Sequence, residues 1–234
     1  MQQFTVVISG FDHYDGVTIN PCVEVPRALA ERGVSLNDQQ DFADQVHIDV
    51  HAVSLPVSYT RAWLVLREAL ETVHPDIVIA TGLKHTARGV MLERCATNLM
   101  SEGRPDADGM MPPTGPINEQ GPAAYWTRLP LRSILRDFAH DAIPASLSSD
   151  AGTFVCNALF YQLLDWTAAH DHVLSGFVSL PRVVNDVRND MRGNAHDSNV
   201  HGLPLDRLVT ACADVVRETV RYRIEPSSDD ILIA

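Results

Sequence analysis

Gly152-Thr153-Phe154-Val155-Cys156-Asn157 joins a strand pattern to a helix pattern. Residues 143–148 before it read as a short strand, and residues 157–166 after it carry apolar side chains at helical spacing. A thiol on the first turn of that helix would lie at the positive end of the helix dipole, among unpaired backbone N–H groups. Both features favour the thiolate, which is the nucleophilic form of cysteine. From these residues alone, Cys156 is either a nucleophile or a buried structural thiol.

Outward from this stretch, strand and helix patterns alternate along the chain. Apolar runs predict strands at 4–9, 46–55, 76–81 and 176–180, and helical periodicity predicts helices at 22–32, 58–73, 131–140, 157–169 and 203–222. Such alternation is typical of βαβ architectures. We therefore predict an α/β fold in three layers (α/β/α), with a mixed, largely parallel sheet and helices on both faces. Since no linker divides the sequence, one domain is expected over residues 1–234.

The composition argues against several classes of partner. The 234 residues are 45% hydrophobic and carry a formal net charge of −12. This charge disfavours nucleic acid and anionic membrane surfaces as partners. No apolar run reaches the ~18 residues of a membrane span, and the first residues lack the pattern of a signal peptide. The four scattered cysteines, without CxxC spacing, are therefore expected to be free thiols in a cytoplasmic protein.

Folds of this class gather their chemistry at the carboxyl ends of the strands. The loops at this edge begin at Gly10, Gly82 and Gly152, and after Ser179. None of them contains GxxxxGK(S/T) or GxGxxG, the patterns that cradle phosphates, and we expect no cofactor. His47 and His51 share a strand face, but no further ligand set accompanies them, so no metal is expected either.

Four segments, in order along the chain, carry a resemblance to a known family. They are Ile8 to Pro21, Gly82 to Asn98 with Arg88 and Glu93-Arg94, Gly121 to Trp126 with Leu129-Pro130, and Ala151 to Asn157 continuing to Phe160-Tyr161. Together they resemble pyroglutamyl peptidase I (pyrrolidone-carboxylate peptidase), a family of cysteine peptidases with an α/β fold and a Cys–His–Glu catalytic set. The resemblance covers most of the chain. It implies a peptide or small amide substrate and a homo-oligomer.

The resemblance also implies roles for individual residues. Cys156 would be the nucleophile, and Glu93 the carboxylate that orients the catalytic imidazole. A small, mostly apolar cavity, sized for a five-membered lactam, is expected beside the thiol. Its lining residues would be Phe11, Tyr14, Asn20, Leu83, Phe154 and Val155.

The pattern departs from the family at the histidine. The family's strand end Gly-Phe-(Ile/Val)-His reads Gly176-Phe177-Val178-Ser179 here, so Ser179 occupies the histidine position. A serine hydroxyl does not titrate near neutral pH and cannot exchange protons as an imidazole does. The histidines on nearby loops that could fill the vacancy are His13, His85, His196 and His201.

The substrate loops depart as well. Lys84 and His85 stand where the family usually has small residues, and Tyr14 replaces a phenylalanine. Arg104 corresponds to a family arginine only if one residue has been inserted.

Three functions remain open from the sequence. The first is a cysteine hydrolase that removes an N-terminal pyroglutamyl group through a Cys156 thioester, with an atypical acid–base group. The second is an acyl-transfer enzyme that acts on another small amide, lactam or thioester. The third is a binding protein that keeps the fold and the pocket without catalysis. Loss of a positioned acid–base group costs about 10²–10⁴ in rate, and esters or thioesters would suffer least, because their leaving groups need little protonation.

Overall fold

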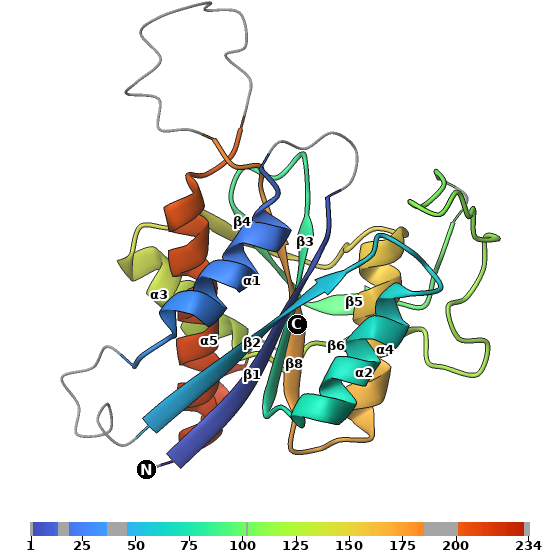
Figure 1. Ribbon diagram of the computed structural model, residues 1–234. Helices are drawn as coiled ribbons and strands as arrows, with labels where there is room; N and C mark the ends of the chain where they lie inside the picture. The colour runs from blue at the N-terminus through green and yellow to red at the C-terminus, as the bar shows by residue number, and fades with distance from the viewer. Residues whose placement is uncertain (1, 14–18, 37–45, 102, 185–200, 232–234) are drawn as a thin grey trace, which may run out of the picture.

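A six-stranded sheet forms the centre of the protein in the computed structural model, which describes residues 2–13, 19–36, 46–101, 103–184 and 201–231. The strand order is β2-β1-β3-β8-β4-β7 (Figure 1). The strands are β1 (Gln2–Phe11), β2 (Val46–Leu55), β3 (Ile77–Leu83), β4 (Val90–Glu93), β7 (Ala145–Ser148) and β8 (Leu174–Leu180). All neighbouring pairs are parallel except β4 and β8. The predicted α/β fold with a mixed, largely parallel sheet is therefore confirmed.

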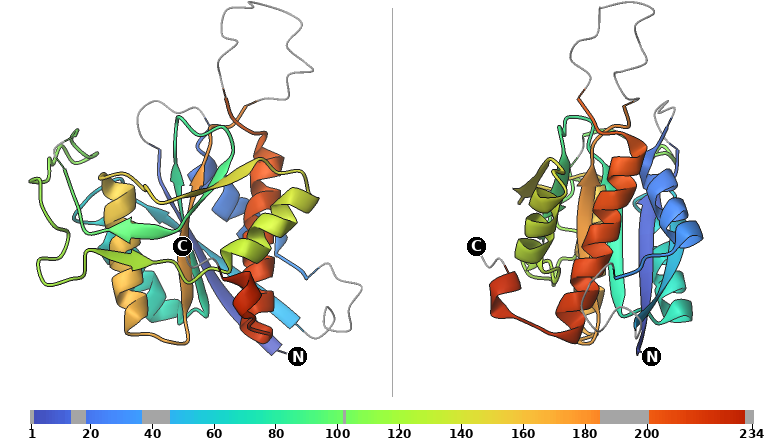
Figure 2. Two further views of the ribbon diagram at one scale, coloured as in Figure 1. Left: turned by 180° about the vertical axis from the view of Figure 1, so that it is seen from behind. Right: turned by 90° about the vertical axis from the view of Figure 1, so that its left-hand side faces the viewer.

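Helices cover both faces of the sheet (Figures 1 and 2). One face carries α1 (Pro21–Arg32), α3 (Leu131–His140) and α5 (Leu205–Ile224), and the other carries α2 (Ala62–Val73) and α4 (Val155–Ala168). A short 3-10 helix, η2 (Ser228–Asp230), follows α5.

Alternation along the strands creates a separate apolar core on each face. In β1, Val6 and Ile8 join the core under α1, α3 and α5, whereas Val7 joins the core under α2 and α4. Successive side chains of a strand point to opposite faces, so a strand covered on both sides must be apolar throughout. The strands β1, β3 and β8, whose sequences are mostly apolar, accordingly lie inside the sheet.

The differences from the predicted elements lie in short or irregular segments. The second helix begins at Ala62 instead of Ser58, with Arg61 at its N-cap. The short strand β4 and the antiparallel pair β5 (Cys95–Thr97) and β6 (Ala124–Trp126) had no predicted counterpart. Segments of three or four residues are too short for periodicity to reveal, and long-range pairing decides them.

The parallel sheet brings the loops after β1, β3 and β8 to one edge, and the first turn of α4 lies at the same edge. No helix in the described part of the chain combines the length and apolarity needed to cross a bilayer.

Candidate active site

Cys156 is the second residue of α4, directly after a turn at Gly152. Gly152 has φ +79°, a left-handed conformation that glycine adopts without strain. Phe154 is the N-cap residue, and no side chain of the described residues caps this helix. The first N–H groups of α4 therefore lie beside the sulfur as hydrogen-bond donors for an incoming oxygen atom.

The sulfur packs against the end of β3. A Cβ atom added to Gly82 would lie 3.0 Å from Cys156 Sγ and 2.6 Å from Cζ of Phe177. A side chain at Gly82 would therefore push the thiol away from the strand. Gly82 pairs with Ser179 in the β3–β8 register, so the sulfur, Gly82 and Ser179 meet at one place.

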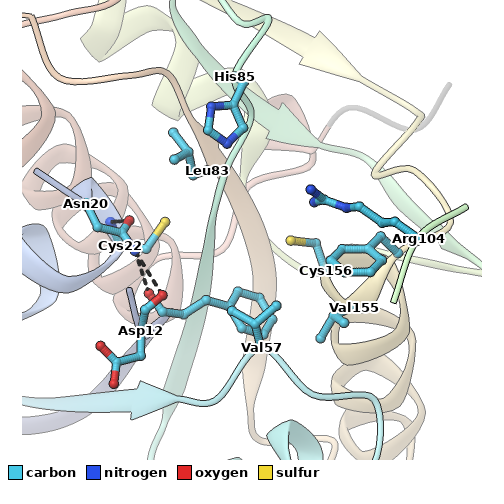
Figure 3. A pocket seen from close by; sticks show the side chains of 11 residues that line it. Asp12, Asn20, Cys22, Val57, Leu83, His85, Arg104, Val155 and Cys156 are labelled. Atoms are coloured by element: carbon cyan, nitrogen blue, oxygen red, sulfur yellow. Dashed lines mark hydrogen bonds between the residues drawn. The ribbon is translucent and has the colours of Figure 1, made fainter. Parts of the chain in front are cut away.

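A cavity of about 60 Å³ opens beside the sulfur (Figure 3). Of the six residues predicted to line it, five do: Phe11, Asn20, Leu83, Phe154 and Val155. Tyr14, the sixth, lies outside the described residues. The lining residues that sequence reasoning did not assign to it are Asp12, Cys22, Val57, His85 and Arg104. Three of these could have been found from the sequence: Asp12 follows Phe11, Cys22 is two positions after Asn20, and Val57 is two positions after the end of β2.

Asn20 lines the cavity, but its side-chain amide forms hydrogen bonds with the backbone. Its Nδ2 donates to the carbonyl oxygens of Phe11 (3.0 Å) and Asp12 (3.1 Å), as the dashed lines of Figure 3 show. Its Oδ1 accepts from the N–H of Cys22 at 3.0 Å and so caps α1. The side chain therefore holds the loop after β1 against the start of α1.

Glu93 and Ser179 are buried together and do not line the cavity. The Ser179 hydroxyl donates to Glu93 Oε1 at 2.7 Å, across 86 positions of sequence. Glu93 is 0% exposed, and its Oε2 has no hydrogen-bond partner among the described residues. The ammonium of Lys84 lies 3.9 Å from Glu93 Oε1. The carboxylate thus meets a hydroxyl and a lysine in the region where an imidazole was expected from the family pattern.

The Cys156 thiol is not acidic in this geometry. Burial raises its pKa to about 12, and the nearby Glu93 charge acts in the same direction. The positive charges of Arg104 and Lys84 act against this rise. A backbone hydrogen bond at the helix start lowers the pKa, as expected, but desolvation of the charged form outweighs it and the favourable charges together.

Arg104 reaches the cavity across an aromatic ring. Its guanidinium carbon lies 4.2 Å from the centre of the Phe154 ring, at a distance typical of a cation–π contact. In Figure 3 the guanidinium and the Cys156 sulfur both point toward the cavity from the same side. Arg104 is therefore placed where it can contact the substrate.

Among the four histidines considered as replacements, His85 lines the cavity. Its Nδ1 accepts from Arg182 Nε at 3.0 Å, which leaves the proton of the neutral ring on Nε2. His13 is exposed beside Asp12, outside the lining set, and His201 is also exposed. His196 lies outside the described residues.

The two histidines of β2 do not form part of a larger cluster. Nε2 of His51 lies 3.0 Å from Asp49 Oδ2. Across the described ranges, no three His, Cys, Asp or Glu side chains gather as a metal site would require.

Comparison with known proteins agrees with this architecture. The family model described as pyroglutamyl peptidase matches residues 4–221. A pyrrolidone-carboxylate peptidase of Bacillus velezensis is 37% identical over 179 residues, which are 76% of this chain and 78% of that protein. One from Bacillus thuringiensis is 34% identical over 186 residues, or 79% and 81% of the two chains.

Solved structures give the same result. Pyroglutamyl peptidase I of Bacillus amyloliquefaciens superposes with a TM-score of 0.77 at 30% identity, covering 94% of this chain and 98% of the other. The pyrrolidone carboxyl peptidase of Thermococcus litoralis gives 0.79 at 29% identity, with 99% of both chains covered. The extent of the match, together with the thiol at the start of α4, leads to one conclusion: this chain belongs to the pyroglutamyl peptidase family of cysteine peptidases.

Proposed function

We propose that this protein removes an N-terminal pyroglutamyl residue from peptides through a thioester on Cys156. The observation that carries the proposal is the position of the sulfur, at the first turn of α4 and facing a small pocket. Attack on the pyroglutamyl carbonyl would place the developing oxyanion near the uncapped N–H groups of that turn. Thiolate attack, loss of the peptide amine and hydrolysis of the thioester would then complete one cycle.

The pocket suits the apolar part of a five-membered lactam. Phe11, Val57, Leu83 and Val155 present apolar side chains that can contact the ring methylenes. The cavity of about 60 Å³ is smaller than the ~150 Å³ cavity that accepts benzene. A bound ring therefore requires at least one lining side chain to withdraw. Because of this small size, the pocket would select against bulkier N-terminal residues.

The acid–base chemistry must come from a group other than the side chain at position 179. Because burial raises the pKa of the thiol to about 12, attack at neutral pH requires a base that takes the proton. In the proposed mechanism Glu93 and Ser179 form the buried anionic end of the site. The Ser179 hydroxyl fixes Glu93 Oε1, and the carboxylate holds a cationic acid–base group near the sulfur.

One observation favours a second function, hydrolysis of a thioester or activated ester. The position of the family histidine holds a serine whose hydroxyl is already engaged by Glu93. A thiolate leaving group needs little protonation, so its expulsion would not depend on a strong general acid at that position.

Parallel hydrolysis assays on two substrates test the proposal and separate the two functions. The substrates are a pyroglutamyl aminocoumarin amide and a pyroglutamyl alkyl thioester. We expect slow but measurable cleavage of the amide, and intact-mass detection of a pyroglutamyl adduct on Cys156. Cys156→Ala should abolish both, whereas Cys212→Ala, which removes a fully buried thiol from α5, is the matched control and should retain them.

The outcomes are distinct. Cleavage of the thioester but not of the amide would refute the peptidase function and support the second function. Absence of turnover and of any adduct, with folded protein, would refute both enzymatic functions and favour a binding role.

A further inference from the structure

Lys84 places the ammonium group of the only lysine in the chain beside the buried carboxylate. The residue follows β3, and its backbone N–H donates to the carbonyl oxygen of Leu180 at 2.8 Å. That bond fixes the start of the side chain between the ends of β3 and β8. The side chain is 31% exposed, so its end can move.

Two contacts define where the ammonium lies. Nζ donates to the carbonyl oxygen of Asp150 at 2.8 Å and lies 3.9 Å from Glu93 Oε1. Asp150 is six positions before Cys156, in the turn that leads into α4. The ammonium thus bridges the buried carboxylate and the segment that carries the thiol.

The Lys84 ammonium can compensate the charge of the Glu93 carboxylate. Glu93 is fully buried, and an ionised carboxylate in such a place requires a compensating charge. Ser179 supplies one hydrogen bond but no charge. Lys84 is two positions after Gly82, the glycine against which the Cys156 sulfur packs, so the lysine and the thiol meet at the end of β3. The positive charge of Lys84 accordingly opposes the rise of the Cys156 pKa.

We propose that Lys84 is a catalytic residue that exchanges protons with Cys156 and with the leaving amine. The proposal rests on the proposed function above, and it assigns to a lysine the acid–base role of the missing imidazole. The four-carbon stem of lysine allows the amine to turn from the Asp150 carbonyl toward the sulfur while it stays near Glu93. Lysine can act as a general acid or base in enzymes.

The proton balance closes with this one residue. Loss of one proton from the Lys84 ammonium to solvent gives the neutral amine, which takes the thiol proton and so leaves a thiolate beside an ammonium. The thiolate forms the C–S bond, and the ammonium protonates the peptide nitrogen as its C–N bond breaks. The amine then accepts a proton from the water that attacks the thioester. Pyroglutamic acid leaves as the C–S bond breaks, and the thiolate and ammonium are restored.

The test combines a measurement on the thiol with a measurement of turnover. We would compare Lys84→Met, Lys84→Arg and Arg88→Met with wild type. Arg88→Met is the matched control, because it removes an exposed positive charge from the same loop. The readouts are the pH dependence of Cys156 alkylation by iodoacetamide, and kcat and KM on the pyroglutamyl amide. Thermal melts establish that each variant is folded.

We expect Lys84→Met to slow Cys156 alkylation at pH 8 by about tenfold, because the thiolate loses a nearby positive charge. Turnover should fall by about 10²-fold or more through kcat, and added methylamine should restore part of it. Lys84→Arg should keep fast alkylation but not turnover, because the guanidinium stays protonated. Arg88→Met should match wild type in both.

Three outcomes would overturn the proposal. One is wild-type alkylation and turnover in Lys84→Met. Another is full turnover in Lys84→Arg, which would show that the charge alone suffices. The third is loss of turnover in His85→Gln with imidazole rescue while Lys84→Met stays active, which would give the role to His85. If wild type cleaves no pyroglutamyl substrate, the proposed function fails, and a Lys84 effect on alkylation would still establish the lysine–thiol pair.

Discussion

Ser179→His places an imidazole on β8, at the position of a hydroxyl that lies 2.7 Å from Glu93 Oε1. In this variant one ring nitrogen should donate to Glu93 and the other should face Cys156. Residue 179 pairs with Gly82, which has no side chain, and Gly82 in turn contacts the sulfur. The register therefore offers the ring a path toward the thiol, with the carboxylate already buried behind it.

The size of the effect follows from two opposing contributions. A positioned acid–base group contributes about 10²–10⁴ in rate, and the neighbouring loops have diverged, so we expect turnover of the pyroglutamyl amide to rise by about one to three orders of magnitude. Forcing the ring into a position that is 5% exposed should cost about 1–3 kcal/mol of stability through overpacking. The melting temperature should therefore fall while activity rises.

The assay measures kcat/KM against pH in four proteins: wild type, Ser179→His, Lys84→Met and the double variant. Activity in the histidine variants should rise as pH passes the imidazole pKa, near 6.5 for an unperturbed ring, because the base must be neutral. If Lys84 is the acid–base group of the wild type, Ser179→His should increase kcat/KM by a larger factor in the Lys84→Met background. Equal or lower activity in every histidine variant, with folded protein and an alkylatable Cys156, would refute the reasoning about the vacant position.

Three further outcomes are expected. Iodoacetamide should modify Cys156 before the three buried thiols, and peptide mapping that finds Cys156 slowest would contradict this. The rate of Cys156 alkylation should rise about tenfold per pH unit through the neutral range, since the pKa of this thiol is about 12. Asn20→Ala should lower the unfolding free energy by about 1–2 kcal/mol and raise KM, because the cap of α1 and two loop hydrogen bonds are lost. An unchanged denaturation midpoint would contradict this structural role of Asn20. Burial raises the pKa of Asp214 to about 6, so the folded protein binds the extra proton, and this residue should lower stability as pH rises from about 4 to about 6. Denaturant unfolding of Asp214→Asn should show a flatter pH dependence over that interval, and an unchanged slope would reject the assignment.

The positions of the main strands along the chain could be predicted because each carries its own signal. The runs around Val6, Val78 and Val178 are mostly apolar and buried, as expected of strands covered by helices on both faces. The helices at Leu131–His140 and Val155–Ala168 likewise follow from local periodicity. Such signals act over a few residues, so one sequence is enough to reveal them.

The pocket could be predicted in outline because its walls come from the carboxyl ends of parallel strands. The family resemblance named Phe11, Leu83 and Val155 as lining residues, and the topology places them together, because Phe11 and Leu83 end β1 and β3 and Val155 begins α4. The short strand β4 could not be predicted, although it positions Glu93. It gains its conformation from pairing with β7 and β8, which are distant in sequence.

The sequence by itself determined the order of the longer strands and helices, the location of the thiol at a helix start and the serine at position 179. Only the tertiary structure decided how these residues interact. The hydrogen bond between Ser179 and Glu93 spans 86 positions, and the Lys84 ammonium lies near that carboxylate because β8 alone separates β3 from β4 in the sheet. The acidity of Cys156 was decided in the same way, because desolvation depends on every atom packed around the sulfur and on no local pattern.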